Sequence, residues 1–155
     1  MNIDFRSSNP VEKRLSNLYP ASFIFLGKRC ASIEGVLQAL KFADCDTQSK
    51  IITKHSFPAK FAGKGVQYSS LHWFGSIFER ASMTYAYFLS ELYFCRFEQN
   101  HNDLELVLSD ECKNMQHSIG NVNPHFTILS QKEFLFHLNE VRQFYLEKRN
   151  NYVVF

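Results

Sequence analysis

The sequence has little of several features that define specialised protein classes. Of its 155 residues only 6 are Gly and 4 are Pro, which excludes collagen-like and Gly/Pro-rich low-complexity chains. The net charge of +2 is too small for a dedicated duplex-DNA binder. No apolar run approaches the roughly 20 residues of a membrane span. Residues 1–10 are polar, unlike a signal peptide, so no membrane association is expected.

Metal and nucleophile motifs are also missing. The four cysteines contain no CxxC pair, which argues against a zinc site and a disulfide framework. The six histidines form no HExxH motif and no i, i+4 pair, and no GxSxG motif is present. We therefore expect no metal, no cofactor and a reducing compartment: the cytoplasm, or the host cytoplasm if a virus encodes the chain.

Aromatic residues, in contrast, are abundant. There are 16 Phe, 7 Tyr and a single Trp, 15% of the chain, within an apolar fraction of 45%. Such a composition at low net charge excludes disorder. The length suits one domain over residues 1–155, large enough to build a core of its own.

Short strands are predicted near the start of the chain. Residues 3–5 and 23–26 are strand candidates, and Gly27-Lys28 is a plausible turn to a partner strand at 29–31.

Most of the remaining chain has the 3.6-residue apolar period of helices. Ser32 is placed to cap a helix, Asp46 could cap a short one, and Pro58 suits the first turn of another that ends at Gly63 or Gly65. A long helix is predicted over residues 71–99, a short one after 102–103, and a final one that begins with the capping box Ser130 to Glu133. The predicted fold class is α+β, with helices as the main component and a small N-terminal hairpin or sheet.

A polar stripe on the helix after Ser32 is the main candidate for chemistry. Glu34, Gln38 and Lys41 are spaced i, i+4, i+7, opposite the apolar positions. A carboxylate, an amide and an amine in one line can bind a sugar and orient a water. The alternative is an ordinary solvated face, which the stripe by itself favours.

Three further candidates have structural alternatives of their own. Ser16 and Asn17 can face a ligand or form a turn. Lys64, between Gly63 and Gly65, suits a phosphate, although the segment lacks Walker A spacing and is also typical of a helix end. Trp73 can stack on a base, but a core position is the more common role.

Taken in order, these signals resemble a family signature. The signature F-S-N…F…G…T-S-E-H-x-x-Q-A-x-K-F belongs to the NADAR or YbiA-like N-glycosidases. It is matched by Phe5, Leu15-Ser16-Asn17, Phe23, Gly27, Ser32, Glu34, Gln38-Ala39 and Lys41-Phe42. The resemblance continues through residues 59–65, Trp73, the run 97–100 and Val141-Arg142, and so covers most of the chain.

The resemblance implies a function. Members of that family cleave N-glycosidic bonds on ribose phosphates, including riboflavin-pathway intermediates and ADP-ribose attached to nucleobases. It implies a YbiA-like fold and a small ribose-phosphate or ADP-ribosyl substrate, free or carried on nucleic acid. Glu34 would align a water or stabilise charge at C1. Lys41 would bind phosphate or attack C1 as an amine. Ser16, Asn17 and Gln38 would hold the sugar, Lys64 the phosphate, and Trp73 would match the family's tryptophan.

The sequence departs from the signature at informative places. Gly35 and Val36 replace a His and an aromatic, and Cys30-Ala31 replaces an aromatic-Pro pair. The family's D-x-x-W-G-x-G loop is replaced by residues 120–125, which contain no Asp and no Trp. Two alternatives therefore stand beside the hydrolase: a relative that binds a nucleotide or protein without cleaving, and a helical partner-binding domain without a small-molecule site.

Overall fold

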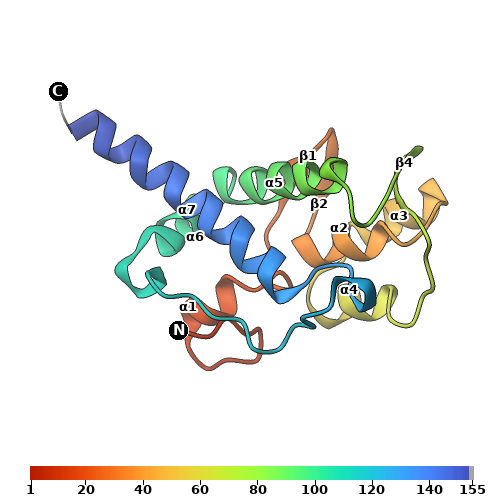
Figure 1. The fold of residues 1–155 in the computed structure, drawn as a ribbon, viewed down its shortest axis with the longest axis horizontal. Helices are drawn as coiled ribbons and strands as arrows, with labels where there is room; N and C mark the ends of the chain where they lie inside the picture. Colours follow the sequence, from red (N-terminus) through yellow and green to blue (C-terminus); the bar gives the residue numbers. More distant parts are fainter. Residues whose placement is uncertain (154–155) are drawn as a thin grey trace.

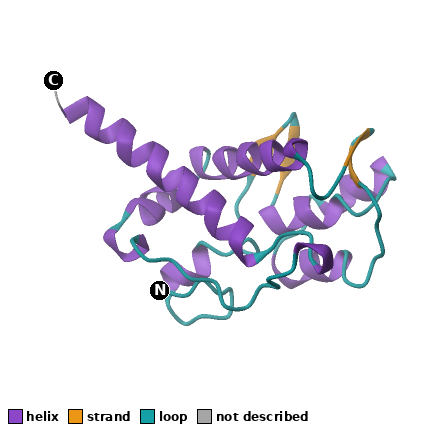
Figure 2. Ribbon diagram, in the orientation of Figure 1, coloured by secondary structure: helices purple, strands orange, loops and turns teal. Residues whose placement is uncertain are grey.

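Two β-hairpins and seven α-helices build the part of the chain that the computed structural model describes, residues 1–153 (Figures 1 and 2). The helices are α1 (Pro10–Arg14), α2 (Ile33–Ala39), α3 (Cys45–Ile51), α4 (Ser56–Ala62), α5 (Met83–Glu98), α6 (His101–Leu108) and α7 (Gln131–Val153). The strands are β1 (Phe23–Phe25), β2 (Lys28–Cys30), β3 (Leu71–Trp73) and β4 (Ser76–Phe78), and two 3-10 turns are η1 (Asp110–Cys112) and η2 (Pro124–Phe126). The mainly helical α+β class predicted from the sequence is confirmed.

Helix α2 lies at the centre of the fold. It contacts α3, α4 and α5, and Figure 1 shows it between α5 and α4. Its first turn begins as predicted, because the Ser32 hydroxyl accepts a hydrogen bond from the Gly35 amide at 2.9 Å. Every residue of α2 is buried. Glu34 and Gln38 of the polar stripe therefore face the interior of the molecule, while Lys41 lies just beyond the end of α2 and is half-buried.

The first hairpin is confirmed, with its turn one residue earlier than predicted. Strands β1 and β2 pair antiparallel, Phe23 opposite Cys30 and Phe25 opposite Lys28. Leu26 and Gly27 have φ of +47° and +79°, as the two central positions of a type I′ turn require. Phe23, Phe25 and Cys30 are buried, so this hairpin closes one side of the core.

The predicted helix over residues 71–99 is wrong in its first third. Residues 71–78 form the hairpin β3–β4, and α5 begins only at Met83, capped by the Ser82 hydroxyl. The apolar residues of this stretch also fit a helical period, which concealed the hairpin. The turn is decided by Phe74 and Gly75, whose φ values of +42° and +95° no α-helix contains.

Two smaller predictions are corrected. Residues 3–5 form no strand; the N-terminal segment makes one isolated bridge, Asn2 to Gln116. Helix α3 is capped by Asp44, whose carboxylate accepts from the Thr47 amide at 2.8 Å, and Asp46 lies within the first turn.

Helix α7 begins as predicted. The Glu133 amide donates to the Ser130 hydroxyl, and the Ser130 amide donates to the Glu133 carboxylate at 2.9 Å. Phe134, Leu138 and Val141 are then buried against α5 and α6. The far end of α7 projects beyond the body of the molecule (Figure 1). No helix in the described residues has both the length and the apolarity needed to cross a bilayer.

Candidate active site

A cavity of about 570 Å³ lies beside the polar stripe of α2. Its wall is formed by α2, the segment 4–6, the turn at 16–18, α4, the segment 65–68 and the long connection between η1 and α7. Of the residues predicted to form a site, the structure brings five together in this wall: Ser16, Asn17, Glu34, Gln38 and Lys41.

Glu34 and Gln38 form one hydrogen-bonded unit in the cavity wall. The Gln38 amide nitrogen donates to Oε1 of Glu34 at 2.7 Å, and the two side chains are 8% and 5% exposed as whole residues. The amide oxygen of Gln38 is buried without a hydrogen-bond partner. A buried polar atom of this kind is costly unless it is paired, and here it lies against the backbone of Gly63.

Burial changes the acid–base chemistry of the stripe. Burial raises the pKa of Glu34, an effect partly offset by the hydrogen bond from Gln38 and by the charges of Lys60 and Lys41. Burial lowers the pKa of Lys41, and the Glu34 carboxylate partly opposes this. The Lys41 ammonium donates to the Gly63 carbonyl at 3.1 Å. The wall thus contains an acid and a base whose charged forms are both disfavoured.

Asn17 is held beside Glu34 by two hydrogen bonds. Its backbone carbonyl accepts from the Glu34 amide at 3.0 Å, and its side-chain oxygen accepts from the buried Tyr93 hydroxyl at 2.8 Å. With the oxygen occupied, the amide nitrogen is the group left for a ligand. The Ser16 hydroxyl accepts from the Leu18 amide at 3.2 Å, which stabilises the turn.

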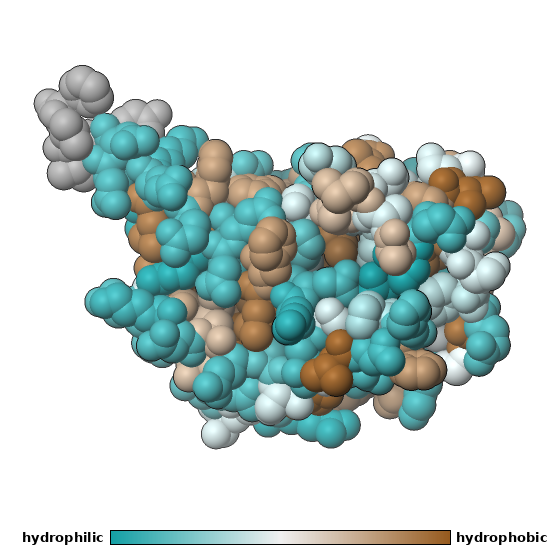
Figure 3. Space-filling view, in the orientation of Figure 1, coloured by the Kyte–Doolittle hydropathy of each residue, from teal (hydrophilic) through white to brown (hydrophobic). Residues whose placement is uncertain are grey.

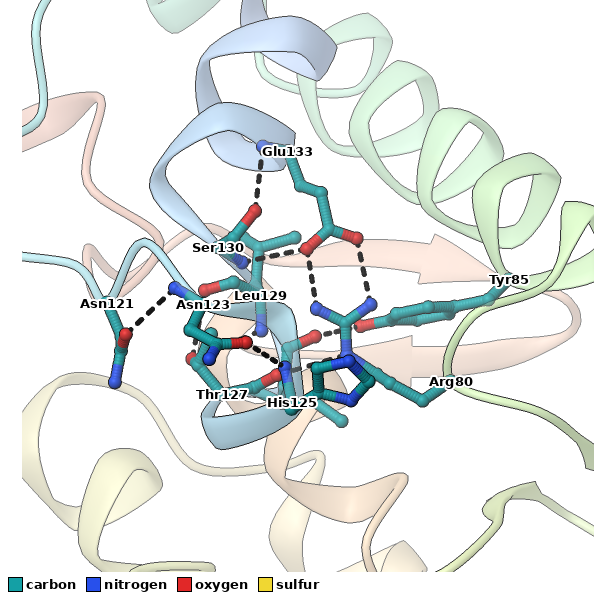
Figure 4. Close-up of polar contacts among 10 residues, drawn as sticks. Arg80, Tyr85, Asn121, Asn123, His125, Thr127, Leu129, Ser130 and Glu133 are labelled. Carbon is teal, nitrogen blue, oxygen red and sulfur yellow. Dashed lines mark hydrogen bonds and ion pairs between the residues drawn. The ribbon is translucent and has the colours of Figure 1, made fainter.

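The loop of residues 120–130 is held by a network of hydrogen bonds (Figure 4). Asn121 and Asn123 each accept from the backbone amide two residues ahead, the first from Asn123 and the second from His125. Arg80 donates to the Thr127 carbonyl at 3.0 Å and pairs with both carboxylate oxygens of Glu133, while the Tyr85 hydroxyl donates to the Ile128 carbonyl. The loop's cavity-lining residues are thereby anchored to α5 and α7.

The structure places Lys64 and Trp73 outside the cavity wall. Lys64 is exposed just after α4, with its ammonium over the Phe61 ring at 5.5 Å. Trp73 is buried in strand β3, where its ring packs within 5.5 Å of Phe25, Phe74 and Phe88. The core alternative for this tryptophan is the one that the structure supports.

Several residues of the cavity wall were not predicted from the sequence. Arg6 and Lys60 add positive charge, and Tyr68, His125 and Phe126 add aromatic surface. Lys60 lies four residues before Lys64 in the same basic, Gly-containing segment, so its position was a usable signal. The others come from irregular segments with no periodicity, and only the fold brings them to the wall.

The fold has a counterpart among solved structures. The fold is similar to that of the Escherichia coli protein YbiA, determined by NMR: TM-score 0.62, 18% sequence identity, with 96% of this chain and 89% of that chain covered. This confirms the YbiA-like fold that the resemblance implied. No curated protein matches the chain. The chain belongs to the family Bacteriophage protein GP30.3, whose model matches residues 10–143.

Proposed function

We propose that the cavity is the active site of an N-glycosidase-like hydrolase that acts on a ribose-phosphate or ADP-ribosyl conjugate. The observation that carries the proposal is the buried Glu34 carboxyl group in the cavity wall, hydrogen-bonded to Gln38 and accompanied by Lys41. The NADAR-type signature of the sequence, which contains these same three residues, supports it. So does the YbiA-like fold.

The reaction that this arrangement supports is hydrolysis at C1 of the ribose. The C1–N bond breaks and its electron pair leaves with the nitrogen, so that C1 gains oxocarbenium character. The Glu34 carboxylate stabilises that charge and accepts a proton from the water whose oxygen bonds to C1. The departing nitrogen takes up a proton from solvent, to which Glu34 returns its own. The products are a free base and a ribose phosphate or, from an ADP-ribosyl conjugate, ADP-ribose. A pKa raised by burial suits this exchange, because a general base works best with a pKa near the working pH.

The remaining wall residues have binding roles in this proposal. The Gln38 side-chain amide and the free Asn17 amide nitrogen hold ribose hydroxyls, and the Ser16 hydroxyl lies in the same wall. Lys41 and Lys60 bind the phosphate. The lowered pKa of Lys41 also suits the second role considered for it, attack on C1 as a neutral amine.

The test is mass spectrometry of products after incubation with a panel of ADP-ribosylated bases and ribosylamino-pyrimidine phosphates. Release of free base is expected from one class, and Glu34→Gln should slow it by about 10²–10⁴-fold, the usual contribution of a general acid or base. Glu147→Gln, a change at an exposed position on α7, is the matched control and should retain full activity. Unchanged turnover in Glu34→Gln would refute the assignment.

One observation favours a second candidate, binding without cleavage. The loop of residues 120–125 brings no carboxylate to the cavity, and Asp4 and Glu34 are the carboxylates of the described wall. A site with a single buried carboxylate can hold a nucleotide without a partner acid for the leaving group. Calorimetry that detects ADP-ribose binding, with no product after hours, would favour this candidate.

A further inference from the structure

At the edge of the cavity and beyond it, three phenylalanine rings alternate with basic side chains along the surface formed by the N-terminal segment and α4. We call this the basic aromatic ridge: Phe5, Phe57 and Phe61 with Arg6, Lys13 and Lys64. Phe5 and Phe57 meet edge to face with ring centres 5.5 Å apart, and Phe57 stacks on Phe61 at 5.9 Å. The three rings therefore form a continuous row.

A cationic side chain lies over each ring of the row. Lys13 lies over Phe5 at 5.3 Å, Arg6 over Phe57 at 5.2 Å and Lys64 over Phe61 at 5.5 Å. All three cations are exposed. Exposed cation–π pairs contribute only about 0.5–1 kcal/mol each, so stability alone is a weak explanation for three in a row.

The ridge also exposes apolar surface that the fold does not use. Phe61 is 56% exposed, although a phenylalanine gains most from burial. Figure 3 shows hydrophobic side chains emerging between hydrophilic ones on the face that it draws. Two carboxylates lie nearby: Asp4 accepts from the Arg6 amide, and Glu12 accepts from the Asn2 amide and the Ser7 hydroxyl. These bonds come from neutral donors, so both carboxylates keep their charge, and the three cations of the ridge outnumber them. The net charge of the ridge is thus positive.

We propose that the basic aromatic ridge binds single-stranded nucleic acid, with a base stacked on the exposed Phe61 ring and phosphates paired with the cations. Single-strand sites combine these two elements, because every base has a π-face and every nucleotide a phosphate. Duplex DNA hides its base faces and does not fit the ridge. A single strand also accords with the small net charge of the whole chain, since stacking supplies part of the affinity that a duplex binder draws from charge.

The ridge is continuous with the cavity. Phe5, Arg6 and Phe57 belong to both, and Lys60 lies on the same helix at the cavity wall. A strand on the ridge therefore has one nucleotide at the cavity mouth. Binding to the ridge does not depend on hydrolysis in the cavity, because Phe61 and Lys13 lie outside the cavity wall.

The experiment is fluorescence anisotropy of a labelled oligo-dT, about twelve nucleotides long, which falls within the usual range of single-strand site sizes. Saturable binding is expected at low salt, weakening with salt. Phe61→Ala should weaken it at least about five-fold, the equivalent of one lost stacking contact. Lys13→Gln should weaken binding and flatten the logarithmic salt slope by about 0.7.

Matched variants separate the ridge from other surfaces and from the active site. Tyr87→Ala removes an aromatic ring that is 68% exposed on α5, and Lys148→Gln removes an exposed charge on α7. Neither should change oligonucleotide affinity, and Glu34→Gln should leave it unchanged while it slows turnover. Absence of binding at low salt, tighter binding of the matching duplex, or equal affinity of Phe61→Ala and the wild type would each overturn the proposal.

Discussion

Gly63 lies directly against the side chain of Gln38. A Cβ at position 63 would be 2.1 Å from the Gln38 amide oxygen, far inside van der Waals contact, and the Gly63 carbonyl accepts from Lys41. The φ of Gly63 is −111°, so its backbone would accept any residue. The close approach of the two residues, and not the backbone conformation, makes glycine necessary here.

Gly63→Ala is therefore expected to destabilise the protein by about 1–3 kcal/mol, the usual cost of overpacking, and to displace Gln38 from Glu34. The measurement is urea unfolding. The control is the double variant Gln38→Ala with Gly63→Ala, which makes room for the new methyl group and should recover most of the loss. Additive effects of the two changes would contradict the contact.

The stability of the protein should decrease as pH rises through the pKa of Glu34. Burial raises that pKa above its ordinary value of 4.5, so the folded chain binds the proton more tightly than the unfolded one. The contribution of Glu34 is thus most favourable below about pH 4.5 and is lost as pH rises through the raised pKa. Glu34→Gln should increase the melting temperature at pH 7 and change it little at pH 4. Glu147→Gln should alter neither; a lower melting temperature of Glu34→Gln at pH 7 would refute the expectation.

Arg80 should control the loop at the cavity wall. It joins the Thr127 carbonyl to Glu133, and the ion pair is partly buried, with the side chains 15% and 27% exposed. Burial acts to raise the pKa of Glu133, but the hydrogen bonds from Arg80 and Ser130 outweigh it and lower the pKa below 4.5. That stabilisation is present above pH 4.5 and is lost as pH falls through the lowered pKa.

We therefore expect Arg80→Met to destabilise the protein at pH 7 by about 1.5–3 kcal/mol, the range for hydrogen bonds to charged groups, with the difference shrinking in acid. Hydrogen exchange should increase at residues 121–130. Arg149→Met, which removes a pair with Glu105 on the surface, is the control and should cost less than about 1 kcal/mol. Equal losses from the two variants would contradict a specific role for Arg80.

Trp73 should report on the core and not on the cavity. Trp73 is 6% exposed, and its ring packs against Phe25 and Phe88. We expect blue-shifted emission that ADP-ribose does not quench, and an ADP-ribose affinity that Trp73→Phe leaves unchanged. That variant should lose less stability than the roughly 3–5 kcal/mol of truncation to alanine. Strong quenching by ADP-ribose would instead indicate that Trp73 contacts the ligand.

The local elements of the fold were predictable where one residue decides them. Ser32 and Ser130 cap α2 and α7 because a hydroxyl satisfies a free amide wherever the chain turns into a helix. The hairpin over residues 71–78 was not predictable from period alone, since its apolar residues fit a helix as well as a strand. The backbone at Phe74 and Gly75 settled that ambiguity.

By itself, the sequence determined the mainly helical class and the polar stripe on α2, because capping and spacing are local properties. It left open whether Glu34 and Gln38 face water or the interior. Only the tertiary structure decided that, since burial depends on α4 and on loops far away in the chain. The same packing brought Lys60 and Arg6 to the cavity and took Trp73 into the core, and it turned the scattered residues Phe5, Phe57 and Phe61 into one row.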